Sequence, residues 1–176
     1  MRLSIIYLLL VICLFPPGVF SEETAQEFIK RGETSLSQGN YDSAISSYEK
    51  ALQLSDEKNL DVKLSILDKL GSINFRKKNY NEAIRYQKET LELGCKIRGE
   101  TSVYCGDANK NLGNYFFKIE ETDKALEAYE SSRSIYIKAL PAKDAKLGLI
   151  ASLIGDCHFA KGNFQKALEY YLQDLE

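Results

Sequence analysis

The stretch FIKRGETSLSQGNYDSAISSYEKAL, residues 28–52, decides the fold of this 176-residue chain. Two helix-forming segments flank the pair Gly39-Asn40, which supplies the left-handed backbone that ends one helix before the next begins. Gly32 in the first segment and Ala44 in the second are small enough to let two antiparallel helices pack closely. The stretch therefore predicts an α-helical hairpin.

The same pattern occurs four times along the chain. Four glycines, one in each copy, are separated by 39, 42 and 42 residues, and an alanine stands twelve residues after each glycine. The positions nine and sixteen residues after the glycine are each aromatic in three of the four copies. Self-similarity at a fixed period is typical of repeat proteins. The glycines are Gly32, Gly71, Gly113 and Gly155, and the alanines are Ala44, Ala83, Ala125 and Ala167.

The periodicity predicts an all-α fold of four antiparallel helix hairpins in one domain, residues 22–176. The predicted helices span residues 24–37, 41–57, 60–77, 80–97, 102–118, 122–139, 143–160 and 164–176. The predicted repeats lie near residues 25–58, 64–100, 106–141 and 148–176.

Residues 28–52 and the corresponding LGSINFRKKNYNEAIRYQKETL, residues 70–91, resemble tetratricopeptide repeats. The 42-residue spacing is longer than the common repeat of about 34 residues, and it is similar to the kinesin-light-chain or LGN subclass. The resemblance covers residues 25–176. It implies a right-handed superhelical solenoid that binds proteins or peptides, but it does not identify the partner.

Two departures from the pattern concern packing. The third repeat has Thr122 in place of an aromatic residue and Ser132 in place of Ala51, so we expect its hairpin to be the loosest. The first helix carries Glu27 and Arg31 where later first helices carry aliphatic residues, which is typical of a solubilising cap.

The last predicted helix presents an apolar face that no later helix covers. Leu168 and Leu172 belong to this face. Either the chain is a fragment of a longer repeat protein, or this face contacts another copy of the chain or a partner. Self-association through the carboxyl-terminal repeat is therefore the alternative function that the sequence leaves open.

The amino-terminal sequence MRLSIIYLLLVICLFPPGVFS, residues 1–21, has the layout of a secretory signal peptide. Val19 and Ser21 fit the small-residue positions of a cleavage site before Glu22. The apolar run of residues 3–15 is shorter than the roughly 20 residues that span a bilayer. We therefore expect export to a periplasm, a secretory lumen or the exterior, with a membrane anchor formed by residues 3–15 as the alternative.

The composition does not favour nucleic-acid binding or catalysis. The net charge is -2 and the pI is near 5.6, without the basic character of a nucleic-acid binder. The single histidine, His158, is expected to be a packed core residue with one hydrogen bond rather than a metal ligand. We find no phosphate-binding loop, so the sequence predicts no enzyme activity, no metal site and no cofactor.

Three cysteines follow residue 21. Cys95 and Cys105 flank the turn between two helices that should pack antiparallel, so a disulfide between them is one expectation. The alternative is that Cys95 is a small apolar residue, because Ile137 holds the matching place one repeat later. Cys157 is expected in the core.

The concave wall of such a stack is built from the first helix of each hairpin. Phe75, Phe117 and Phe159 are 42 residues apart and are predicted to form a stripe along this groove. The alternative is that each phenylalanine covers a neighbouring helix. The predicted groove residues are Ile29, Glu33, Leu36, Asp68, Ser72, Phe75, Arg76, Lys110, Asn114, Phe117, Lys118, Ser152, Asp156 and Phe159. The sequence thus predicts an exported scaffold that binds a peptide or helix in this groove.

Overall fold

The computed structural model describes residues 23–56 and 58–173, and within them it contains eight helices and no strand. The predicted signal peptide and the alternative anchor lie outside these residues. The first helices of the hairpins are α2 (Ala25–Ser37), α4 (Leu60–Arg76), α6 (Val103–Lys118) and α8 (Ala145–Ala160). The second helices are α3 (Tyr41–Leu54), α5 (Tyr80–Arg98), α7 (Thr122–Ala139) and α9 (Phe164–Gln173).

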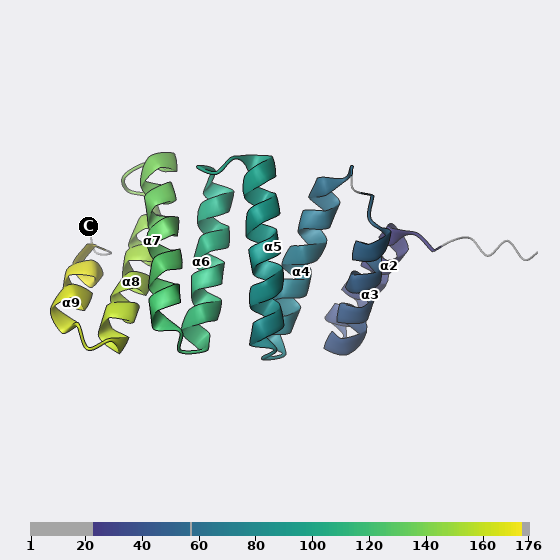
Figure 1. The fold of residues 1–176 in the computed structure, drawn as a ribbon, viewed down its shortest axis with the longest axis horizontal. Helices are drawn as coiled ribbons and strands as arrows, with labels where there is room; N and C mark the ends of the chain where they lie inside the picture. The colour runs from purple at the N-terminus through teal and green to yellow at the C-terminus, as the bar shows by residue number, and fades with distance from the viewer. Residues whose placement is uncertain (1–22, 57, 174–176) are drawn as a thin grey trace, which may run out of the picture.

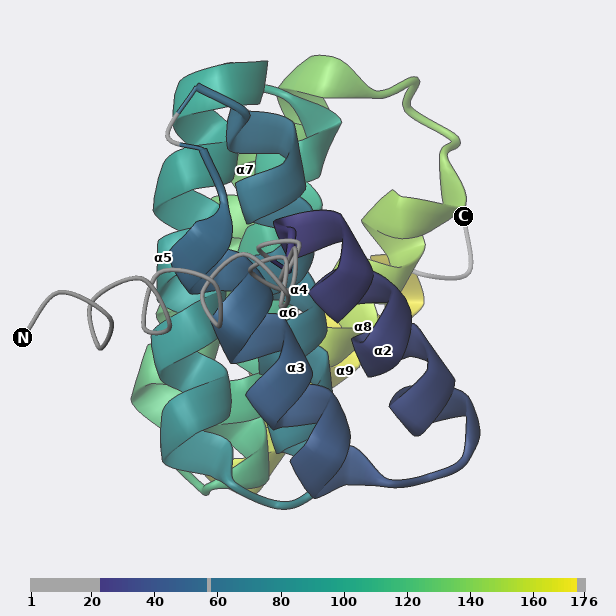
Figure 2. The ribbon, with the colours of Figure 1, turned by 90° about the vertical axis from the view of Figure 1, so that its right-hand side faces the viewer.

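The helices form four antiparallel hairpins that stand side by side in chain order (Figure 1). Each helix packs mainly against the helices that precede and follow it in the chain. Figure 2 views the stack from the end that carries α2 and α3, with the later hairpins behind them. The predicted all-α, right-handed solenoid of helix hairpins is confirmed. No helix among the described residues is both long enough and apolar enough to cross a membrane.

The first helix of every hairpin begins at a side-chain cap. Thr24, Asn59, Ser102 and Asp144 each accept a hydrogen bond from a backbone N–H in the first turn of the helix that follows. Such caps satisfy donors that the helix itself cannot satisfy. The cap at Asp144 is the reason that α8 begins at Ala145 and not at residue 143 as predicted.

Helix α3 ends at Leu54, three residues before the predicted end. The Ser55 hydroxyl donates to the Leu52 carbonyl at 2.7 Å, and an Asp56 carboxylate oxygen accepts the backbone N–H of Lys58 at 2.8 Å. Short polar side chains that bond to nearby backbone groups compete with the helix in this way. This shorter helix lies in the interval of 39 residues between Gly32 and Gly71, whereas the later intervals are 42 residues long.

The turn inside each hairpin places one residue in the left-handed region. Gly39 and Gly162 occupy this place in the first and last repeats, as the Gly-Asn pattern predicted. Lys78 and Glu120 occupy it in the middle repeats, with φ values of 65° and 63°. The sequence pattern did not reveal these two residues, because neither is a usual left-handed residue.

We expect Glu120→Gly to raise the free energy of unfolding by about 0.5–1 kcal/mol, since glycine adopts a positive φ without the steric cost that glutamate bears. Chemical denaturation of the purified protein measures the change. Gly39→Ala is the matched control, and it should destabilise. Destabilisation by Glu120→Gly would contradict the strain argument.

The repeat glycines make room for tyrosine rings rather than for close backbones. A Cβ built on Gly113 would lie 2.5 Å from the Tyr129 ring, and one built on Gly155 would lie 2.6 Å from the Tyr171 ring. Gly71 differs, because Gln87 replaces the tyrosine and a Cβ there would meet its nearest atoms at 3.6 Å. The four repeat alanines are fully buried, as expected for small residues between packed helices. Three of the four repeat glycines instead leave space for a tyrosine ring of the second helix.

The third hairpin is not loosely packed, and that prediction is wrong. Ser132 is fully buried, and its hydroxyl donates to the Gly106 carbonyl at 2.8 Å. The Tyr136 ring covers Gly106 on the same side, where an added Cβ would lie 2.4 Å from a ring carbon. Serine is therefore used here as a small hydrogen-bonding core residue.

The apolar interior is divided into two clusters. One joins α2, α3 and α4 with Tyr86, and the other joins α5, α6, α7 and α8. Buried polar side chains of the second hairpin, Asn74, Gln87 and Thr90, accompany this division. Gln87 donates to the Ala108 carbonyl at 3.2 Å, whereas the Thr90 hydroxyl has no partner among the described residues. The second hairpin is thus the place where the apolar core is interrupted.

Candidate partner-binding groove

The predicted groove residues all lie on the first helices of the hairpins, α2, α4, α6 and α8. Glu33, Arg76 and Lys118 are exposed, and Ile29 is half-buried. The first helix also behaves as a cap, because Glu27 and Arg31 are exposed and Arg31 forms an ion pair with Glu23 at 2.5 Å. The fold therefore places polar and apolar side chains together along one wall of the solenoid.

The three phenylalanines of the predicted stripe are not equivalent. The Phe75 ring is half-buried and stacks on Tyr115 of the next hairpin, with ring centres 4.4 Å apart. Cys157 holds the place of Tyr115 one repeat later and is too short to stack on Phe117. Phe117 is 36% exposed and Phe159 is 59% exposed. The stripe is thus reduced to two accessible phenylalanines, and Phe75 follows the alternative of covering a neighbouring helix.

Tyrosines from the second helices fix two polar groove residues. The Tyr129 hydroxyl donates to Asn114 Oδ1 at 2.8 Å, and the Tyr171 hydroxyl donates to Asp156 Oδ1 at 2.8 Å. Burial, followed by this bond to Asp156, raises the pKa of Tyr171 to about 12. Because the Tyr129 and Tyr171 rings lie against Gly113 and Gly155, their hydroxyls reach Asn114 and Asp156 on the same first helices. The aromatic residue sixteen positions after the glycine, present in three of the four copies, was the sequence signal for this arrangement.

Asp68, a predicted groove residue on α4, has a perturbed pKa. The side chain is open to water, yet the protein around it raises its pKa by burial, and the charge of Lys69 opposes the shift. The Asp68 charge also raises the pKa of Tyr104 and Tyr115 on α6, although burial is the larger cause for both tyrosines.

An ionic cluster at the start of α6 was not predicted. Asp107 accepts the Tyr136 hydroxyl at 2.6 Å and the Lys146 ammonium at 2.5 Å, so it joins α6, α7 and α8. Lys110, a predicted groove residue, lies 3.8 Å from the same carboxylate. Burial acts to raise the pKa of Asp107, but the bonds from Lys146 and Tyr136 outweigh it and hold the pKa below its ordinary value.

We expect Asp107→Asn to lower the free energy of unfolding by about 1–2 kcal/mol near neutral pH. A carboxylate with a lowered folded-state pKa contributes stability that is present above the unfolded-state pKa of about 4 and is lost as pH falls through the folded-state value. The difference between wild type and variant should therefore be constant above about pH 5 and shrink below about pH 4. Denaturation at a series of pH values measures it, and a difference that does not change with pH would contradict the assignment.

The cysteines and the histidine lie away from the groove surface. Cys95 and Cys105 form a disulfide between α5 and α6, with Cα atoms 5.4 Å apart. Cys157 is a buried free thiol, and burial raises its pKa to about 11. His158 is buried and stacks on Tyr170, but its Nδ1 has no hydrogen-bond partner among the described residues. The part of the chain that the structure describes contains no cluster of side chains arranged to hold a metal ion.

The sequence model of the tetratricopeptide repeat family matches three overlapping segments of the chain, residues 22–93, 62–138 and 109–176. Together they cover most of the chain. The chain belongs to the tetratricopeptide repeat family. Repeats of this family are protein–protein interaction scaffolds, and this tetratricopeptide repeat protein is built as one.

The relatives of this tetratricopeptide repeat protein are longer than the chain itself. It is 26% identical over 147 residues to the outer dynein arm-docking complex subunit 4 of Xenopus laevis, and the match covers 82% of this chain and 26% of that protein. The chain therefore spans about a quarter of the length of this curated relative.

Solved structures support the fold. BtubC (BKLC) from P. vanneervenii has a TM-score of 0.75 at 24% identity, with 85% of this chain and 61% of that chain covered. Kinesin light chain TPR-like repeats from Podosopora anserina have a TM-score of 0.70 at 14% identity, with 87% and 75% covered. These structures share the fold predicted for the hairpin repeats, and one of them consists of kinesin light chain TPR-like repeats.

Proposed function

We propose that this protein binds a segment of a partner protein in the concave groove of its solenoid. The observation that carries the proposal is the pair Phe117 and Phe159, which hold the same place on successive first helices and remain exposed by 36% and 59%. Exposed aromatic side chains are favoured contacts in protein interfaces. Asn114 and Asp156, fixed by tyrosine hydroxyls, add oriented polar groups to the same wall.

Phe117→Ala and Phe159→Ala should each weaken partner binding by about 1–3 kcal/mol and leave the fold intact, because neither side chain belongs to the two apolar clusters. The partner is captured from native extract on the immobilised protein, identified, and titrated by calorimetry against wild type and variants. Leu54→Ala is the control, since Leu54 is 51% exposed but lies on α3. Equal affinity of the partner for wild type and for both phenylalanine variants would refute groove binding.

We also propose that the protein is exported, with residues 1–21 removed as a signal peptide. The disulfide between Cys95 and Cys105 supports this, because disulfides persist in oxidising compartments and are rare in the cytosol. Amino-terminal sequencing of the native protein should find Glu22. Recovery of Met1 on a membrane-bound form would favour the anchor of residues 3–15 instead.

Self-association through the last repeat is the second candidate function. Leu168 and Leu172 on α9 are each 53% exposed, and they lie four residues apart on one face of the helix. Analytical ultracentrifugation of wild type and Leu168→Asp tests it. A monomer at all concentrations would eliminate this candidate.

A further inference from the structure

A carboxylate on the first helix of the second hairpin has no cationic partner. Asp68 of α4 is exposed, and it forms no ion pair with any residue that the structure describes. The protein around it nevertheless raises its pKa by burial, and the charge of the adjacent Lys69 only partly opposes this shift. A carboxylate that is partly removed from water and unpaired attracts a cation from outside the chain.

Two tyrosines of the next first helix lie on either side of the level of Asp68. Helices α4 and α6 run in the same direction (Figure 1), and their register is given by Phe75, whose ring stacks on Tyr115 with ring centres 4.4 Å apart. Asp68 stands seven residues before Phe75, on the same face of α4. Tyr104 stands eleven residues before Tyr115, on the same face of α6. The Asp68 charge accordingly acts on the hydroxyls of both tyrosines.

Both tyrosine rings are held in place, but their hydroxyls remain available. The Tyr104 ring packs over Gly94, where an added Cβ would clash with it, and Tyr115 is stacked on Phe75. Neither hydroxyl forms a hydrogen bond with a described residue, in contrast to the hydroxyls of four other tyrosines. Both hydroxyls reach water, because the buried polar atoms that lack a partner among the described residues do not include them. Two hydroxyl oxygens are therefore free to accept hydrogen bonds near the Asp68 carboxylate.

Other cations near this place pair with other carboxylates. Arg98 at the end of α5 forms an ion pair with Asp61 at 2.6 Å. Lys110 on α6 lies 3.8 Å from the carboxylate of Asp107. These pairs leave Asp68 to a cation that the chain itself does not supply.

We propose that Asp68, Tyr104 and Tyr115 form a site for a lysine or arginine side chain of the partner segment that binds in the concave groove. The Asp68 carboxylate accepts hydrogen bonds from the ammonium or guanidinium group, and the two hydroxyl oxygens accept further ones. Charge-assisted hydrogen bonds of this kind are roughly twice as strong as neutral ones. The site rests on groove binding as proposed above, and it adds the chemistry of the partner, which carries a basic residue opposite the second hairpin.

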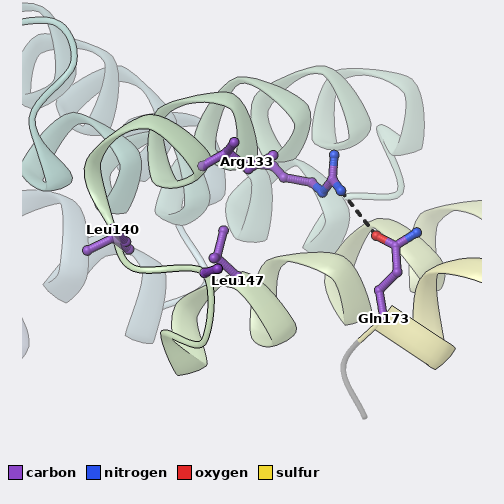
Figure 3. Close-up of a pocket in the computed structure, with 6 residues that line it drawn as sticks. Arg133, Leu140, Leu147 and Gln173 are labelled. Carbon is purple, nitrogen blue, oxygen red and sulfur yellow. Dashed lines mark hydrogen bonds between the residues drawn. The ribbon is translucent and has the colours of Figure 1, made fainter. Parts of the chain in front are cut away.

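The probe is Nα-acetyl-lysine N-methylamide, a single basic side chain on a neutral backbone. Two-dimensional NMR of the isotope-labelled protein, purified from full-length expression, should show saturable shift changes at Asp68, Tyr104 and Tyr115. Nα-acetyl-norleucine N-methylamide lacks the ammonium group and should produce none there. The pocket drawn in Figure 3 is an internal control, because its lining residues include no acid and already supply the Arg133 cation, which donates to Gln173.

Asp68→Asn removes the charge and keeps the shape of the side chain, so it should weaken binding of the lysine probe by about fivefold or more. Glu33→Gln is the matched control, because Glu33 is also an exposed groove carboxylate without an ion pair, but the hydroxyl of the tyrosine near it, Tyr48, is buried. This control should change the affinity less than twofold. Tyr104→Phe/Tyr115→Phe keeps both rings and should weaken binding at least twofold. Circular dichroism of each variant establishes that the helical fold is retained.

The partner captured with the wild-type protein provides the second arm of the test. Asp68→Asn should weaken its binding at least tenfold. Replacement of each basic residue of the bound partner segment by norleucine, one at a time, should identify one position at which wild type and Asp68→Asn bind the altered segment equally well. Such a result couples that residue to Asp68 directly.

Several results would overturn the proposal. Absence of saturable shifts, or equal affinity of the lysine probe for wild type and Asp68→Asn, excludes the site. Equal losses in Asp68→Asn and Glu33→Gln would show only a general attraction to negative charge. If Phe117→Ala and Phe159→Ala weaken the captured partner and Asp68→Asn does not, groove binding stands and the basic site fails. If only Asp68→Asn weakens it, the basic site stands and the role of the phenylalanines fails.

Discussion

Gly113→Ala should lower the free energy of unfolding by about 1–3 kcal/mol, even though alanine is the better helix former. The added Cβ would lie 2.5 Å from two carbons of the buried Tyr129 ring, and no real Cβ approaches ring atoms so closely. The Tyr129 hydroxyl is bonded to Asn114, so the ring can move only by giving up that bond. Denaturant unfolding followed by circular dichroism measures the loss.

Gly71→Ala is the control, because it makes the same chemical change in a hairpin without the ring. Its Cβ would meet ordinary contacts at 3.6 Å or more, so the variant should gain up to about 1 kcal/mol from helix propensity. A loss of stability in Gly113→Ala together with a gain in Gly71→Ala would show that the glycine is needed where a tyrosine ring packs against it. Similar destabilisation by both substitutions would show instead that close helix approach is what every repeat glycine provides.

Reduction of the Cys95–Cys105 disulfide should lower the free energy of unfolding by about 3 kcal/mol. The bond closes a short loop with a sequence separation of 10, and the chain-entropy model gives about this value for a loop of such length. The loop carries the start of α6, including the Ser102 cap. Thermal unfolding with and without reductant should therefore differ by roughly 5–12 °C.

The double variant Cys95→Ser/Cys105→Ser should be insensitive to reductant, which controls for effects on the buried Cys157 thiol. Thiol titration of the unreduced, denatured protein that begins at Glu22 should find one free thiol. Three free thiols in that titration would show that the native protein lacks the bond.

The sequence predicted the hairpins well because their determinants are local and repeated. A small residue, a turn and an aromatic residue at fixed spacing specify a hairpin without reference to the rest of the chain. Helix ends were displaced where Ser55 and Asp144 bond to nearby backbone groups, a competition that periodicity does not detect. Ser132 was misjudged because a polar residue in a core position is informative only once its acceptor, the Gly106 carbonyl, is known.

The groove was predicted less completely because exposure depends on the next repeat. Phe75 and Phe117 hold equivalent places, and only the residue facing each one, Tyr115 or Cys157, decides whether the ring is covered. The Asp107 cluster joins residues 29 and 39 positions apart, which spacing within a single repeat could not reveal.

The buried polar side chains of the second hairpin should also affect how the solenoid responds to a pulling force. When a repeat protein is pulled at its two ends, the tension acts along the whole row of hairpins. Because each repeat contacts only its neighbours, the row separates first where the contact between neighbours is weakest. Asn74, Gln87 and Thr90 place that weak point between the two apolar clusters. Under a steady pull we expect the molecule to lengthen in two steps, with α2, α3 and α4 separating first from the disulfide-linked remainder.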